Sequence, residues 1–151
     1  MTDKIIYWLG AEFTHFCSSY YLKKLIDAEL YAIIDITNKP KSFFENQTLV
    51  KFNKVWFFND HIKKNHKPDL VYLSNFEKKY KINLLELAIN ERIFYRFFDF
   101  YKFSTEEILS IVEQECKLFE KVVTEIKPDF LITKEASRHH HQLFYELCNA
   151  I

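Results

Sequence analysis

Apolar residues along the chain form short continuous runs that alternate with longer segments of helical periodicity. The runs have the length and the β-branched or aromatic content of strands that are buried on both faces. Strands are therefore expected at Lys4–Leu9, Leu30–Ile36, Lys54–Phe58 and Asp129–Thr133. The only glycine, Gly10, follows the first run and predicts a sharp exit from that strand.

The segments between these runs repeat apolar residues at the i, i+3, i+4 spacing of a helix with one buried face. The clearest start is Ser104, which fits a capping box with Glu107. Helices are expected over about Thr14–Asp27, Pro68–Tyr80, Leu84–Glu91, Thr105–Ile126 and Ser137–Ala150. The pattern of residues 41–50 is poorly determined, with room for a helical turn.

Alternation of buried strands with helices is typical of an α/β fold with a parallel sheet. The 151 residues, 48% of them hydrophobic, suffice for one packed core, so a single domain over 1–151 is expected. In such a fold another strand should follow the last helix. We therefore expect Ile151 to be the boundary of an amino-terminal fragment of a longer protein.

Charge and segment composition restrict the partners. Twenty-one basic residues balance twenty-one acidic ones, so no overall field attracts nucleic acid. No apolar stretch approaches the roughly 20 residues that cross a bilayer, and the first residues lack a signal peptide. A cytoplasmic protein is predicted, with peripheral membrane association at most. Cys17, Cys116 and Cys148 show no CxxC spacing and are expected to be reduced core residues.

In open parallel sheets, ligands bind beyond the carboxyl ends of the strands, so the loops there are candidate sites. The first such loop carries Glu12, His15 and Gly10, and Gly10 is a candidate substrate-binding residue. The chain has no GxGxxG or P-loop motif, which disfavours a phosphate cradle. Glu12 and His15 are candidate catalytic acid/base groups. The alternative is that they are a solvated carboxylate and a capping or packing histidine.

The second loop is the densest polar cluster in the chain. It contains five candidate substrate-binding residues, Lys134, Glu135, Arg138, His139 and His140, which could bind a phosphate or a polyol. Consecutive histidines on a helix point about 100° apart, which disfavours a triple-histidine metal site. No metal ion and no cofactor are predicted. A polar first helical turn is the alternative reading of this loop.

An aromatic strip, Arg92–Phe103, interleaves seven rings with three cations. It could stack on bases or sugars or rest on a membrane. Packing within the core or against another domain is favoured, because seven rings in water invite association.

Several pieces together resemble the amino-terminal region of bacterial and archaeal surface or capsular polysaccharide biosynthesis proteins: Ile5–Gly10, Tyr80–Leu84, Tyr101–Ser104, Glu113–Cys116, Lys127–Phe130 and His140–Cys148. Those proteins are similar to GT-B glycosyltransferases, in which two Rossmann-like halves face each other. The resemblance implies a Rossmann-like sheet flanked by helices, forming the acceptor-side half of such a protein. A second domain would then supply the nucleotide-sugar site, and the partners would be a nucleotide-sugar and a saccharide acceptor.

Two other functions stay open. The chain could be a non-catalytic α/β interaction module that docks a partner or forms a homo-oligomer through the aromatic strip. It could also be a stand-alone domain that binds a small molecule or nucleotide at the Gly10 loop.

Overall fold

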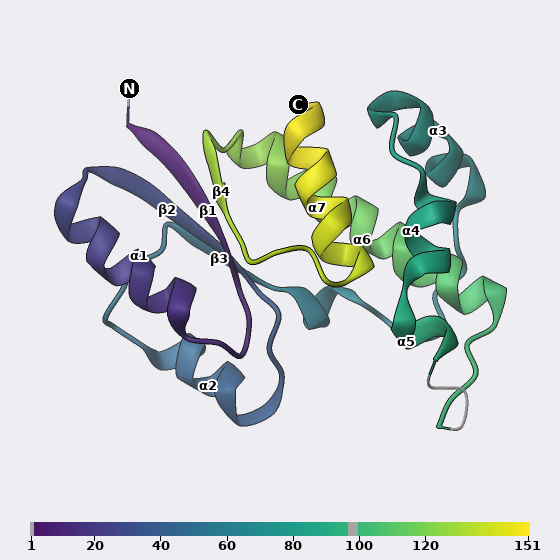
Figure 1. Ribbon diagram of the computed structural model, residues 1–151, viewed down its shortest axis with the longest axis horizontal. Helices are drawn as coiled ribbons and strands as arrows, with labels where there is room; N and C mark the ends of the chain where they lie inside the picture. Colours follow the sequence, from purple (N-terminus) through teal and green to yellow (C-terminus); the bar gives the residue numbers. More distant parts are fainter. Residues whose placement is uncertain (1, 97–99) are drawn as a thin grey trace. The chain divides into compact units, whose positions relative to one another are not determined.

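A computed structural model describes residues 2–96 and 100–151 of the chain, with its helices and strands labelled in Figure 1. The chain divides into two compact units. We call Met1–Asp60 with Ile126–Glu135 the sheet unit, and His61–Glu125 with Ala136–Ile151 the helical unit. Each is described by itself, and the expectation of a single domain ending at a fragment boundary stays a prediction.

The sheet unit contains four parallel strands, β1 (Asp3–Leu9), β2 (Ala28–Ile34), β3 (Lys54–Phe57) and β4 (Phe130–Ile132). Their order in the sheet is β3-β2-β1-β4. In the register of the two central strands, Asp3 lies opposite Ala28 and Leu9 opposite Ile34. The predicted α/β class, with an all-parallel, Rossmann-like sheet flanked by helices, is confirmed.

Two helices of the sheet unit follow its first two strands, α1 (Thr14–Leu25) and α2 (Asn38–Asn46). One apolar cluster joins alternate residues of β1 and β2 to Phe16 of α1 and Phe44 of α2. The residues between them in the strands, such as Ile6 and Ile33, are also fully buried. Burial of both faces of β1 and β2 explains why these two strands appear in the sequence as continuous apolar runs. The same expectation is wrong for β4, where Phe130 is exposed and the next two residues are only partly buried. The undetermined segment 41–50 contains most of α2.

The predicted apolar face of α1 is wrong in part. Phe16 and Ser19 are its buried residues, and the Ser19 hydroxyl donates to the Phe16 carbonyl oxygen at 2.7 Å. Tyr21 and Leu25 are exposed, and so is Cys17. Successive residues lie about 100° apart around a helix, so a helix with a narrow buried face leaves the side chains beside that face exposed to water. All three cysteines are free; the core prediction is confirmed for Cys116, wrong for the exposed Cys17, and only partly met by the half-buried Cys148.

Three hydrogen bonds fasten the short strand β4 beside the start of β1. The Asp129 carboxylate accepts from the backbone N–H of Lys4 at 2.8 Å, and the backbone N–H of Asp129 donates to the Lys4 carbonyl oxygen at 2.9 Å. The Lys4 ammonium donates to the Ile126 carbonyl oxygen at 3.1 Å. These bonds set the register that pairs Ile5 with Phe130.

The helical unit holds α3 (Leu70–Tyr80), α4 (Leu84–Asn90), α5 (Arg92–Tyr95), nearly all of α6 (Thr105–Ile126) and α7 (His139–Ala150). A short 3-10 helix, Phe58–His61, precedes them. The capping box of α6 is confirmed, because the Ser104 hydroxyl accepts from the Glu107 N–H and the Glu107 carboxylate accepts from the Ser104 N–H. The one-turn helix α5, capped by Glu91, was not predicted.

Within residues 2–96 and 100–151, none of the helices combines the length and the apolar content that crossing a membrane requires.

Candidate functional site

The first predicted loop lies at the carboxyl edge of the sheet. It follows β1 and leads into α1, whose first turn includes His15. Glu12 is exposed and His15 is partly exposed. Because β4 is parallel to β1, Lys134 and Glu135 leave the sheet at the same edge. The candidate residues of the sheet unit, Gly10 among them, are thus placed along one edge as expected.

Gly10 directly follows β1, and the sharp exit expected there stays a prediction. Its φ is not positive, and a Cβ atom added there would meet no atom within 4 Å. The chain therefore does not need a glycine at this position for its backbone conformation.

The second predicted loop is divided between the two units. Lys134 and Glu135 belong to the sheet unit, whereas Arg138, His139 and His140 belong to the helical unit, at the start of α7. The helix begins at His139, and Arg138 is its N-cap residue in extended conformation. A single cleft that combines Glu12 and His15 with Arg138 and His139 stays a prediction.

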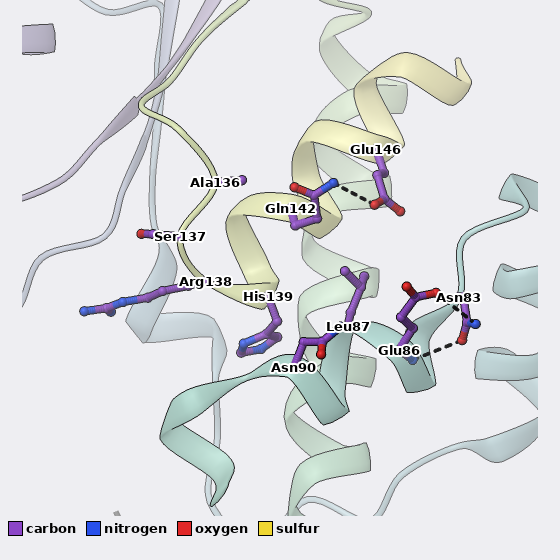
Figure 2. Close-up of a pocket in the computed structure, with 10 residues that line it drawn as sticks. All are labelled: Asn83, Glu86, Leu87, Asn90, Ala136, Ser137, Arg138, His139, Gln142 and Glu146. Atoms are coloured by element: carbon purple, nitrogen blue, oxygen red, sulfur yellow. Dashed lines mark hydrogen bonds between the residues drawn. The ribbon is translucent and has the colours of Figure 1, made fainter. Parts of the chain in front are cut away.

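Within the helical unit, a pocket of about 360 Å³ lies between α4 and α7. Amide, carboxylate and imidazole side chains dominate its lining, which also includes the apolar Leu87 (Figure 2). The lining residues are Asn83, Glu86, Leu87, Asn90, Ala136, Ser137, Arg138, His139, Gln142 and Glu146.

Hydrogen bonds between lining residues orient the polar groups of the pocket. The Asn83 side chain caps α4 by accepting from the Glu86 N–H at 3.0 Å, and its amide nitrogen donates to the Glu86 carboxylate at 3.3 Å. On α7, the Gln142 amide donates to Glu146 at 2.8 Å. Figure 2 shows the Arg138 guanidinium directed away from these groups. The described lining is therefore suited to hydroxyl donors rather than to a phosphate.

His139 lines this pocket and is held by two buried carboxylates. Its backbone N–H and its Nδ1 both contact Oε2 of Glu91, at 2.8 and 2.6 Å. Its Nε2 lies 2.8 Å from Oε2 and 3.1 Å from Oε1 of Glu115. The Phe94 ring packs beside the imidazole, with 4.9 Å between centroids. Glu91 comes from the N-cap of α5, and Glu115 from the middle of α6.

The two carboxylates keep His139 charged. Burial alone would lower its pKa, but the charges and hydrogen bonds of Glu115 and Glu91 outweigh burial and raise the pKa to about 9. Burial alone would raise the pKa of Glu91, yet hydrogen bonds from His139 and from the backbone N–H groups of Ile93 and His139 lower it to about 2. At neutral pH this is a carboxylate–imidazolium–carboxylate group.

Sequence reasoning found His139 but missed both of its partners. Glu115 had a signal, because it falls on the apolar stripe of α6 between Ile111 and Phe119, where a carboxylate needs a buried partner. Glu91 had none, because its role depends on a one-turn helix that the hydrophobic pattern does not reveal. The expected polar first turn of α7 is in fact buried at His139, His140 and His141.

Some rings of the aromatic strip are buried and others are exposed. Phe94 is buried and contacts Phe103, with 5.3 Å between ring centroids, as expected of core packing. Phe100 and Tyr101 are exposed, by 87% and 53%. Phe97, Phe98 and Asp99, which belonged to the predicted strip, lie outside the described residues.

Comparisons of the chain with known protein families, with curated proteins and with solved structures gave no match.

Proposed function

We propose that the chain is the saccharide-binding, acceptor-side part of a glycosyltransferase-like protein of surface-polysaccharide synthesis. The observation that carries the proposal is the pocket between α4 and α7, whose walls offer Asn90, Gln142 and two carboxylates around an apolar Leu87. Amide and carboxylate groups accept hydrogen bonds from vicinal hydroxyls, while an apolar side chain packs against sugar C–H groups. The Rossmann-like sheet and the sequence resemblance support the same function.

In this proposal the sheet unit supplies the acid/base chemistry. Transfer of a glycosyl group needs a base near the acceptor oxygen, and Glu12 and His15 at the edge of the sheet are the candidates. A second domain would bind the nucleotide-sugar, with Lys134 available to its phosphates. The reaction would take place in the cytoplasm.

Saturation-transfer NMR on the purified chain tests the binding part. Neutral hexoses and N-acetylhexosamines should bind at millimolar concentration, and uronic acids should bind more weakly because Glu86 and Glu146 repel their carboxylates. Gln142→Ala should weaken binding about fivefold to tenfold, by loss of one or two hydrogen bonds. Asn149→Ala, an exposed position of the same helix outside the lining, is the control. Absence of saccharide binding contradicts the proposal.

A genetic experiment tests the catalytic part separately. Glu12→Gln and His15→Asn, introduced in the source organism, should reduce the amount of surface polysaccharide while the protein level stays constant. Unchanged polysaccharide would remove the catalytic assignment of these two residues and leave the saccharide pocket standing.

A further inference from the structure

Three buried side chains of the helical unit bring metal-ligand atoms together. Glu115 comes from α6, and His139 and His140 come from the first turn of α7. One ligand atom from each lies within 4.8 Å of the other two, among the residues that the structure describes. All three residues are at least nine-tenths buried.

The donor set is that of a transition-metal site. Two imidazole nitrogens and one carboxylate oxygen are ligands that Zn²⁺ binds at about 2.0 to 2.2 Å. Tetrahedral geometry at such lengths puts neighbouring ligand atoms roughly 3.3 Å apart. The separations of 2.8 and 3.1 Å between Nε2 of His139 and the Glu115 oxygens are close to that value. Three protein ligands leave a fourth position for water or another ligand.

Glu91 contacts the outer ring nitrogen of His139, Nδ1, and is not itself one of the three proposed ligands. Its Oε2 accepts from Nδ1 of His139, and its Oε1 accepts from the Ile93 N–H at 2.9 Å. A carboxylate behind the outer nitrogen of a metal-ligating histidine fixes the ring and its tautomer. With Nδ1 engaged in this way, Nε2 is the nitrogen that faces Glu115.

Adjacent side chains point about 100° apart around a helix, but ligand atoms of His139 and His140 still lie within 4.8 Å of each other and of Glu115. Their ring centroids are 5.1 Å apart. We propose that Glu115, His139 and His140 form a binding site for a divalent transition-metal ion of the zinc type, oriented by Glu91. The ion takes the place of the proton on Nε2 of His139. This inference does not depend on saccharide binding, although the two sites share His139.

Zinc and cobalt titrations of the chelator-treated full chain test the site. Calorimetry should show one tight Zn²⁺ site per chain, and bound Co²⁺ should give the visible absorption bands of a tetrahedral complex. X-ray absorption of the zinc form should show two imidazole ligands together with oxygen ligands. Absence of one-to-one binding at micromolar Zn²⁺, with Glu91 and Glu115 holding a protonated His139 instead, would overturn the proposal.

Variants separate this site from simple binding to a histidine run. Glu115→Gln and His140→Asn should each weaken Zn²⁺ binding by more than about 100-fold, and Glu91→Gln by about 10- to 100-fold. His141 belongs to a second group of possible ligand atoms that also contains His140, so His141→Asn distinguishes the two groups and should bind as the wild type does. Binding that tolerates Glu115→Gln, or that is lost in His141→Asn, contradicts the site. Circular dichroism checks each fold, and the isosteric Glu115→Gln decides if His140→Asn does not fold.

Discussion

The sheet unit and the helical unit use different interior chemistry. The core of the sheet unit is formed by aliphatic and aromatic residues of strands that are buried on both faces. Among the residues that the structure describes, the buried carboxylates and imidazoles belong to the helical unit: Glu91, Glu113, Glu115, His139, His140 and His141. An apolar core needs only shape, whereas each buried charge needs a partner. Among the described residues, buried carboxylates and imidazoles are thus a feature of the helical unit.

The buried carboxylates of the helical unit pair with side chains of α6 itself and of neighbouring elements. Glu113, which is fully buried, contacts Nε2 of His66 and the Lys117 ammonium, each at 2.5 Å. Glu115, two residues further along α6, contacts His139. Gln114 itself accepts from the Lys63 N–H at 2.8 Å. Three successive residues of α6 thus fasten one loop, residues 62–69, and the helix α7 by polar contacts rather than by apolar packing.

The largest effect is expected from removing one partner of the buried ion group. Glu91→Ala leaves His139 with a single carboxylate and removes the N-cap of α5. Loss of one partner of a buried pair costs about 3–5 kcal/mol, which urea denaturation would measure as a lower free energy of unfolding. Glu12→Ala, at an exposed position of the sheet unit, should change that energy by less than about 0.5 kcal/mol. Equal effects would contradict the contrast between the units.

A slightly smaller effect is expected from a cavity in the sheet unit. Leu30 is fully buried in the central strand β2, and Leu30→Ala should cost about 3 kcal/mol by lost apolar contact and cavity formation. Leu25→Ala, where the side chain is 79% exposed, is the matched control and should be nearly neutral. Urea denaturation of both variants checks this. A loss below about 1 kcal/mol for Leu30→Ala would show that the sheet core is loosely packed.

The pH dependence of stability should come from the ion group of the helical unit. The lowered pKa of Glu91 contributes stability that is present above 4.5 and is lost as the pH falls towards 2. The raised pKa of His139 contributes stability that is present below 6.5 and is lost as the pH rises through 9. The metal-free chain should therefore be most stable between about pH 4.5 and 6.5, and the loss of stability on each side should be on the order of 3 kcal/mol.

Urea midpoints from pH 2 to pH 10, in the presence of a chelator, measure this profile. His139→Gln should remove the alkaline limb, because no imidazolium remains to lose its proton. Leu30→Ala should lower the whole curve without changing its shape. An alkaline limb that persists in His139→Gln would assign it to another group.

The smallest effect is expected at Gly10. Since Gly10→Ala adds a methyl group in open space without a positive φ, its free energy of unfolding should stay the same or rise by up to about 1 kcal/mol. The thermal midpoint and saccharide binding should both be retained. A strong destabilisation would mean that the turn after β1 needs glycine after all.

Much of the fold was predictable from local pattern. The runs Lys4–Leu9 and Lys54–Phe58 correspond to β1 and β3, and the capping box at Ser104 marked the start of α6. Such features depend on residues that are close in sequence, so the sequence shows them directly. The exposed side of α1 was misjudged because apolar residues such as Leu25 also occur on surfaces.

The candidate site was predictable only in part. The cluster of ionisable residues after β4 led to His139, because residues after parallel strands are candidates for binding. Glu91, 48 residues away, could not be assigned to it from spacing.

By itself, the sequence determined the strands, the longer helices and the α/β class, because apolar periodicity and capping act over a few residues. Only the tertiary structure decided that Glu91 and Glu115 enclose His139, and that α4 and α7 enclose a polar pocket. Buried charges are stabilised by partners at short distance in space, and nothing in the local pattern specifies which distant residue will be that partner.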